Sequence, residues 1–248
     1  MTKIAIIGGS GLENPDILKN PDTLNIDTPF GKPSSVFKTG TIEGKEVAIL
    51  SRHGLEHSIP PTQVNNRANI WAIREIGCTH IITTTACGSL REEIKRGDLV
   101  ILDQFIDFTR HREITFFDKF EKGIMKHAPM SDPFDANLRQ KLIESAGSLN
   151  LNFHPIGTVI TIEGPRFSTR AESNIFRMWG ADVINMSVAP ECILANELEI
   201  PYASVALSTD YDCWKTDEEP VTWEEVLKEF NKNVEKMIQL LVQTISSL

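Results

Sequence analysis

Short runs rich in Ile, Val and Thr alternate along this chain with segments that carry a helical pattern of apolar residues. Seven of these runs have the length and composition of buried strands, and they begin at Lys3, Val47, His80, Asp98, Gly157, Asp182 and Tyr202. Helices are predicted between them, over residues 63–76, 137–149, 170–179 and 190–198. This alternation favours an α/β fold with a largely parallel sheet and helices on both of its faces.

The end of the chain predicts one long helix with a single apolar face. From Leu227 to Leu248, apolar residues recur at spacings of three and four residues. Thr222 stands where an N-cap belongs, and Glu225 follows three residues later, as in a capping box. We therefore expect this helix to begin after Thr222 and to dock on the sheet.

The composition limits the classes of protein to which this chain can belong. With 248 residues and 41% hydrophobic content it is long enough to bury a full core, and we expect one α/β domain over residues 1–248. No run approaches the ~20 apolar residues of a membrane helix and the N-terminus lacks the layout of a signal peptide, so we expect a cytoplasmic protein with no membrane partner. A net charge of −9 argues against nucleic acid as a partner, because affinity for its backbone comes from clustered Lys and Arg.

Groups that suit an anion follow four of the predicted strands. Ligands of open α/β sheets bind outside the carboxyl ends of the strands, where we expect these groups to meet. In chain order they are the Gly9-Ser10-Gly11 turn, Arg52 and His53, Thr85 and Ala86, and Met186 and Ser187. Backbone N–H groups, a guanidinium, a ring N–H and hydroxyls all donate to phosphate oxygens. Each group has a structural alternative, such as a strand-end cap or a solvated arginine, so only their shared location favours a phosphate site.

Two carboxylates, Asp210 and Asp212, follow the last predicted strand. Because they are two residues apart, an extended chain would point them the same way. They would repel a neighbouring phosphate unless they faced something else, and a purine meets that requirement. Its N7 needs a proton as the glycosidic bond breaks, and its 6-amino group needs an acceptor. The alternative for this Asp-Tyr-Asp segment is a turn in which the side chains bond to their own backbone.

Nine motifs match one protein family in register from Lys3 to about Lys228. They are IIGGSGL from Ile6, DTPFGKPS from Asp27, RHG from Arg52, NRANIWA from Asn66, TTACGSLREE from Thr84, DQFIDFT from Asp103, IEGPRFSTRAES from Ile162, WGADVINMS from Trp179 and STDYDCW from Ser208. These motifs closely resemble the methylthioadenosine-cleaving members of the purine nucleoside phosphorylase family.

This resemblance implies a fold, an assembly and a reaction. The fold would be a mixed, mostly parallel and partly barrel-like sheet flanked by helices. The assembly would be a homotrimer, or a dimer of trimers, in which each active site borrows residues from a neighbour. The reaction would be phosphate-dependent cleavage of 5′-methylthioadenosine to adenine and 5-methylthioribose 1-phosphate, a pentosyl transfer of purine and methionine salvage. Inorganic phosphate would be a co-substrate, with no cofactor and no metal.

The family pattern also assigns roles to residues at matching positions. Phosphate would be held by Ser10, Arg52, His53, Thr85, Ala86 and Ser187. The nucleoside would contact Phe167, Ser168, Met186, Asp210 and Asp212, and its 5′ substituent would lie near Val221, Trp223, Val226 and a neighbouring subunit's His127. A protonated Asp210, with its pKa raised by burial, would be the general acid toward N7. Relatives that prefer 6-oxopurines carry Asn at this position, so Asp favours a 6-amino purine.

Two departures from the family pattern bear on the 5′ end of the substrate. Trp223 stands where a small aliphatic side chain is familiar, so it either narrows the 5′ pocket or packs the first turn of the last helix. The chain also ends at Leu248, short of the segment that covers a neighbour's 5′ pocket in longer members. The ranking of methylthioadenosine, adenosine and methylthioinosine as substrates therefore stays open.

Three other interpretations remain. An NAD-dependent oxidoreductase is the rival enzyme, since IIGGSG resembles the opening of a Rossmann fingerprint, although Asn14 stands where the third glycine belongs. A non-catalytic module that binds purine is the second. A metal site at His53 and His57 is the third, and it lacks a third ligand of clear spacing. The four cysteines are widely separated with no C-x-x-C pair, which predicts reduced thiols.

Overall fold

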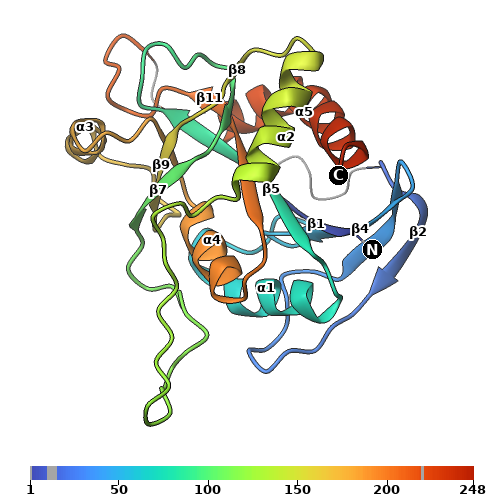
Figure 1. The fold of residues 1–248 in the computed structure, drawn as a ribbon. Helices are drawn as coiled ribbons and strands as arrows, with labels where there is room; N and C mark the ends of the chain where they lie inside the picture. The colour runs from blue at the N-terminus through green and yellow to red at the C-terminus, as the bar shows by residue number, and fades with distance from the viewer. Residues whose placement is uncertain (1, 10–15, 219–220) are drawn as a thin grey trace.

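The computed structural model describes residues 2–9, 16–218 and 221–248, so Ser10 lies outside the described part of the chain. The described strands form one sheet in the order β2-β3-β4-β1-β5-β10-β9-β7, with β11 added to β5, β6 to β11 and β8 to β6 (Figure 1). Their bounds are β1 Lys3–Gly8, β2 Lys19–Leu24, β3 Phe37–Ile42, β4 Lys45–Ser51, β5 His80–Ser89, β6 Leu99–Ile101, β7 Gln104–Phe108, β8 Phe153–His154, β9 Thr158–Ile162, β10 Val183–Asn185 and β11 Tyr202–Asp210.

Strand β5 is the centre of this sheet. Strand β1 pairs parallel with its first residues, up to Ile7 opposite Thr83, and β11 runs parallel to it along the other edge as far as Gly88. Strand β10 pairs antiparallel with the last two residues of β5, on the same edge of β5 as β1 but beyond the point where β1 ends. Residues 84–87 of β5 thus have no strand partner on this edge among the described strands, which opens a gap between β1 and β10.

The seven predicted strands are all present, with two differences. The run from Asp98 is broken into β6 and β7, because the first pairs with β11 and β8 and the second with β9. Three strands were not predicted. All six residues of β2 are exposed and β8 has two residues, so neither carries the apolar signal of a buried strand, while β3 joins β2 to β4 in an antiparallel meander. Antiparallel pairs thus accompany the parallel ones, and no pairing among the described strands closes the sheet into a full barrel.

The predicted helices form α1 (Asn66–Glu75), α2 (Ala136–Ser148), α3 (Arg170–Met178), α4 (Val188–Glu197) and α5 (Trp223–Ser246). Helix α1 begins three residues later than predicted, since the 3₁₀ turn η1 (Pro61–Gln63) precedes it and the Asn65 side chain caps Ala68 N at 3.0 Å. Helix α5 begins as expected, with Thr222 Oγ1 accepting from Glu225 N at 3.3 Å. No helix of the described ranges has the length and hydrophobicity needed to cross a bilayer.

The helices cover the sheet in two layers (Figure 1). Alternate side chains of β1 divide between them: Ala5 and Ile7 face the core that contains α1 and α4, and Ile4 and Ile6 face the core that contains α2 and α5. Burying one isoleucine side chain stabilises the fold by about 1.5–3 kcal/mol. Because alternate residues of the strand point to opposite faces and both sets are apolar, each face favours a covering layer of helices.

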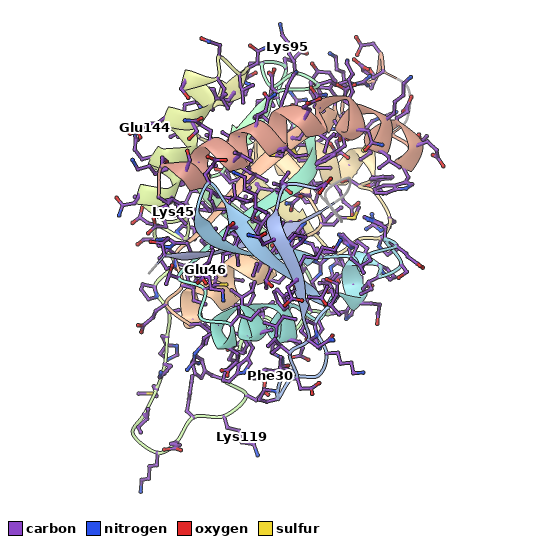
Figure 2. The ribbon with its side chains drawn as sticks, turned by 90° about the vertical axis from the view of Figure 1, so that its right-hand side faces the viewer. Phe30, Lys45, Glu46, Lys95, Lys119 and Glu144 are labelled. Atoms are coloured by element: carbon purple, nitrogen blue, oxygen red, sulfur yellow. The ribbon has the colours of Figure 1, made fainter. Side chains whose placement is uncertain are left out.

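One segment leaves the body of the molecule. Residues 109–131, which we call the arm, lie between β7 and α2, and the middle of the arm, around Lys119, projects away from the sheet (Figures 1 and 2; Lys119 is labelled in Figure 2). The arm carries exposed apolar side chains, including Phe120, Ile124 and Met125.

Candidate active site

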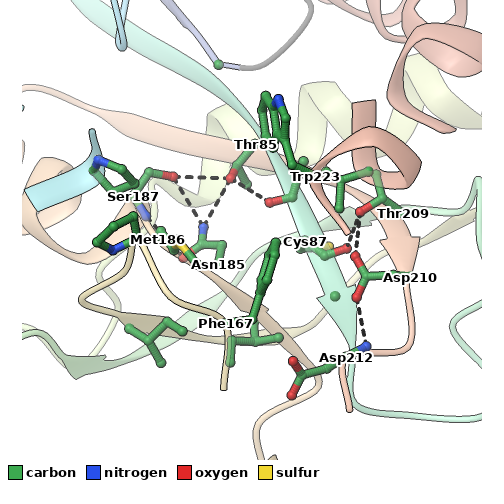
Figure 3. Close-up of a pocket in the computed structure, with 18 of the residues that line it drawn as sticks. Thr85, Cys87, Phe167, Asn185, Met186, Ser187, Thr209, Asp210, Asp212 and Trp223 are labelled. Carbon is green, nitrogen blue, oxygen red and sulfur yellow. Dashed lines mark hydrogen bonds between the residues drawn. The ribbon is translucent and has the colours of Figure 1, made fainter. Parts of the chain in front are cut away.

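A cavity of about 340 Å³ lies at the gap in the edge of β5. All five groups predicted to meet are represented in its lining, by Gly9, Arg52, His53, Thr85, Ala86, Met186, Ser187, Asp210 and Asp212. Figure 3 shows the hydroxyls of Thr85 and Ser187 at one end, here called the anion end, and Asp210 and Asp212 at the other, the acid end. The predicted convergence is therefore observed.

The geometry that brings these groups together differs in two ways from the expected edge of parallel strand ends. Thr85 lies inside β5 and Asp210 is the last residue of β11, because both strands continue beyond the point where β1 ends. Ser187 follows a strand that runs antiparallel to β5. Because Ile184 lies opposite Gly88 in this antiparallel pair, the residues after Ile184 run back along β5 toward Thr85. Ser187 Oγ therefore lies 3.1 Å from Thr85 Oγ1.

Arg52 is anchored beneath the anion end by a buried carboxylate. Its side chain is 2% exposed, and Nη1 donates to Thr84 O at 2.9 Å. The other edge of the guanidinium faces Glu191, with Nε donating to Oε1 and Nη2 donating to Oε2 at 3.0 Å. Glu191 is fully buried on α4 and also accepts from Tyr202 Oη at 3.0 Å. This pair holds the guanidinium in one orientation and balances its charge. Glu191 was not among the residues predicted from the sequence.

Close packing at Arg52 explains the glycine that precedes Ser10. A Cβ on Gly9 would lie 2.6 Å from Arg52 Nη1 and 3.1 Å from Thr84 O. Any larger residue would displace the guanidinium, so glycine is required here by contact distance.

His53 forms part of the wall next to Arg52. Its Nδ1 lies 2.9 Å from Ile59 O, so a neutral ring carries its proton on Nδ1 and a protonated ring also donates from Nε2. The ring stacks on His57, with 4.6 Å between centroids, and His57 stacks on Trp223 at 5.0 Å. Three aromatic rings in series thus connect the anion end to the first turn of α5.

The acid end forms a turn, and the prediction of an extended Asp-Tyr-Asp segment is wrong. Asp212 has a left-handed φ of 48°, and its N–H donates to Asp210 Oδ1 at 2.7 Å. This is the turn considered as the alternative. Both carboxylates nevertheless line the cavity, at 8% exposure for Asp210 and 5% for Asp212. The ladder between β11 and β5 is irregular at Thr209, and an irregularity of this kind re-aims the side chain that follows it.

Burial raises the pKa of Asp210, against the opposing effects of Thr209 Oγ1 at 2.8 Å from Oδ2 and of the Asp212 N–H. Burial raises the pKa of Asp212 as well. Gly88 makes room for this arrangement, because a Cβ there would lie 2.7 Å from Asp210 Oδ1 and 3.0 Å from Ile184 Cγ2. The acid end therefore favours a protonated carboxyl more than an aspartate in water does.

The two ends are bridged by apolar side chains. Phe167 lies between them in Figure 3 and is 39% exposed, and Ser168 lines the cavity beside it. The backbone of Met186 is held by Arg112, whose Nη1 donates to Met186 O at 2.6 Å and whose Nε donates to Glu163 Oε1 at 3.2 Å. Arg112 was not predicted, because it lies outside the nine matched motifs and nothing near it in the sequence indicates a contact with Met186.

The sequence profile described as the phosphorylase superfamily matches residues 3–246. This chain belongs to the phosphorylase superfamily. The match includes the opening IIGGSG, so the Rossmann oxidoreductase interpretation is wrong.

Relatives of this phosphorylase carry more specific names. The S-methyl-5′-thioadenosine phosphorylase of Xenopus tropicalis is 53% identical over 99% of this chain and 89% of its own length. The methylthioadenosine phosphorylase of Schistosoma mansoni, solved with adenine, is 41% identical with a TM-score of 0.95 and covers 100% of this chain and 92% of its own. A single-substitution mutant of the same Schistosoma enzyme, solved with methylthioadenosine, is 40% identical with a TM-score of 0.94, covering 100% of this chain and 91% of its own.

Some predicted residues of this phosphorylase lie away from the cavity. His127 is on the arm, where its ring packs against Phe120 at 5.6 Å, and it does not line the cavity of its own chain. Val221 does not line the cavity either. Of the three residues predicted near the start of α5, only Trp223 and Val226 do so. Trp223 is 41% exposed, lines the cavity and stacks on His57.

No group of three His, Cys, Asp or Glu side chains with the proximity of a metal site occurs in the described residues of this phosphorylase. His53 and His57 instead contact each other through their rings. Cys78, Cys87 and Cys192 are buried, and burial raises the pKa of each thiol.

Proposed function

We propose that this phosphorylase cleaves 5′-methylthioadenosine with inorganic phosphate, giving adenine and 5-methylthioribose 1-phosphate. The observation that carries this proposal is a single cavity with donors for an oxyanion at one end and buried carboxyl groups at the other. A ribose between the two ends would have phosphate on one side and its base on the other. The names of the Xenopus and Schistosoma relatives support the choice of nucleoside.

Phosphate binds at the anion end in this proposal. Arg52, His53, the hydroxyls of Thr85 and Ser187 and the backbone at Ala86 face it, and Ser10 completes the set. As the C1′–N9 bond stretches, the sugar becomes an oxocarbenium-like cation, which the bound phosphate stabilises before one of its oxygens bonds to C1′. Because the donors are fixed by buried partners, they need little rearrangement during the reaction.

The leaving base is neutralised at the acid end. The electron pair of the C1′–N9 bond passes to the purine, and N7 takes the proton of Asp210, which becomes a carboxylate. Burial raises the pKa of Asp210, which favours the protonated carboxyl that this step requires. Asp212 and Ser168 lie at the edge of the base and Asp212 accepts from the 6-amino group, while Phe167 stacks on the purine and Met186 lies under the ribose.

The 5′ end of the substrate points toward Trp223 and Val226. A neighbouring copy would supply His127 from its arm and close this end, as a homotrimer, alone or in a dimer of trimers, allows. The projecting arm and its exposed apolar side chains support that assembly. We also propose a cytoplasmic protein of one domain that needs phosphate but no cofactor or metal.

The test is a comparison of base release from methylthioadenosine, adenosine and methylthioinosine, each with and without phosphate. We expect adenine from methylthioadenosine at the highest kcat/KM, and no release of base when phosphate is omitted. Equal release without phosphate would contradict phosphorolysis, and a preference for methylthioinosine would contradict the role of Asp210 and Asp212.

A further inference from the structure

Asn185 lies behind the two hydroxyls of the anion end (Figure 3). It is the last residue of β10 and is 5% exposed. Its Nδ2 lies 3.3 Å from Thr85 Oγ1 and 3.5 Å from Ser187 Oγ, so one amide group contacts both hydroxyls. As part of the predicted strand that begins at Asp182, it gave no signal in the sequence.

The other side of the amide shows which of its atoms is the oxygen. Asn185 Oδ1 lies 2.8 Å from Thr161 Oγ1 and accepts from Ser187 N at 3.4 Å. Thr161 Oγ1 accepts from Ala189 N at 3.1 Å, so the proton of Thr161 remains available for Asn185. Ala189 is in the first turn of α4, where backbone N–H groups have no acceptor within the helix. The donors therefore run in one direction, from the helix through Thr161 to Asn185.

The hydrogen bonds keep the same donor-to-acceptor direction from Asn185 to the hydroxyls at the cavity. With Oδ1 fixed as the acceptor, Nδ2 has two protons, and these are the ones that Thr85 and Ser187 receive. A hydroxyl that accepts a hydrogen bond still has its own single proton to donate. In the structure the Thr85 hydroxyl donates to Ala86 O at 3.0 Å, next to the cavity, and a rotation about one bond would turn it to a ligand.

We propose that Asn185 is a positioning residue that keeps the Thr85 and Ser187 hydroxyls as donors toward bound phosphate. This inference rests on the proposed phosphorolysis. Oriented neutral donors matter here because the charge of Arg52 is already balanced by buried Glu191. A chain of aligned hydrogen bonds also polarises its last members, which strengthens their donation to an anion.

The principal test is a double-mutant cycle with the KM for phosphate as readout. Asn185→Leu should raise this KM about tenfold, the effect of losing one or two neutral hydrogen bonds, and change the KM for the nucleoside less than about twofold. In a Thr85→Val, Ser187→Ala background, the same substitution should have no further effect on the phosphate KM, since the groups through which it acts are absent. Equal effects in both backgrounds, or equal effects on both substrates, would overturn the inference.

A second variant keeps the test independent of how well Asn185→Leu folds. Thr161→Val preserves shape and removes the hydroxyl that fixes the amide, so the phosphate KM should rise about threefold. Thr244→Val is the matched control, because Thr244 is also fully buried but bonds to Leu240 O within α5. We expect both variants to lower the thermal midpoint and only Thr161→Val to change the phosphate KM.

Indistinguishable phosphate KM values for these two variants would overturn the role of Asn185. Phosphate-independent cleavage by the unmodified chain would instead overturn the proposed function, and this inference with it. The two failures are therefore separated by the assay of the unmodified chain.

Discussion

The anion end of the cavity is assembled from residues far apart in the chain, whereas the acid end is organised mainly by its own segment. The Arg52–Glu191 pair spans 139 residues and the Thr85–Ser187 contact spans 102. Asp210 instead contacts Thr209 Oγ1 and the Asp212 N–H, one and two residues away. The anion end therefore depends on correct packing of β5, β10 and α4, while the properties of the acid come from a local turn and from burial.

This difference predicts two classes of variant. Replacing Asp210 itself should reduce catalysis without weakening the fold, and changes beneath the anion end should reduce stability and phosphate binding together.

Asp210→Asn should have the largest effect, on catalysis. Asparagine keeps the shape and the acceptor for Asp212 N but has no acidic proton, so kcat for methylthioadenosine should fall about 10²–10⁴-fold. The phosphate KM, measured in the same assay, should change less than about twofold. Near-normal turnover would remove Asp210 from the role of general acid.

Glu191→Gln should have the largest effect on stability. Breaking a buried ion pair by neutralising one partner typically costs about 3–5 kcal/mol, because the other charge stays buried. Denaturant unfolding measures this difference, and the phosphate KM should rise in parallel. Glu199→Gln is the control, since Glu199 is exposed and should leave both quantities unchanged. A Glu191→Gln protein as stable as the control would contradict the importance of the pair.

Gly88→Ala tests a close contact that the acid end makes with the neighbouring strand β5. The new methyl group would press on Asp210 and Ile184, so we expect a loss of about 1–3 kcal/mol in unfolding free energy and a lower kcat. Gly147→Ala serves as the matched control, because nothing lies within 4 Å of its Cβ position on α2, and it should stabilise by about 0.5–1 kcal/mol. Equal changes in unfolding free energy and kcat for the two variants would show that a methyl group at position 88 does not press on Asp210 and Ile184.

The pH dependence of stability tests the state of Asp210. Because its folded pKa is raised, its contribution to stability is fully present below the unfolded pKa of about 3.9 and is lost as the pH rises through the folded pKa. Asp210→Asn cannot lose a proton, so its unfolding free energy should increase relative to the unmodified chain as the pH rises from 4 to about 8. Parallel curves would show that burial does not perturb this carboxyl.

Trp223→Val should have the smallest effect, confined to the 5′ end. Removing the ring widens the cavity beside His57, so the ratio of kcat/KM for methylthioadenosine over adenosine should fall a few-fold, which is below the range of about 10–200-fold that a fitted apolar contact can reach. The phosphate KM should not change. An altered phosphate KM would show that Trp223, through His57, determines the position of the His53 ring.

Most of the strands, the helices and the convergence at one cavity could be predicted because apolar periodicity and strand ends are local features. Glu191 could not be assigned in this way, since its partner Arg52 is 139 residues away in the sequence. Its one signal is a carboxylate within the otherwise apolar segment VAPECILA. Asn185 gave none, because its role depends on the antiparallel register of β10, which the alternation of strands and helices does not reveal.

The turn at Asp212 was expected only as the alternative to an extended segment. A left-handed φ at a non-glycine residue is uncommon, so an extended segment was the simpler prediction. Burial, the Asp210–Asp212 hydrogen bond and the space at Gly88 together favour the turn. Such a balance depends on contacts that form only in the folded chain.

The most direct test of the central claim is a crystal structure of this chain with inorganic phosphate and adenine bound together. We predict phosphate within hydrogen-bond distance of Thr85, Ser187 and Arg52, and adenine on Phe167 with N7 at Asp210. Phosphate and adenine in separate cavities, or adenine at the anion end, would contradict the account.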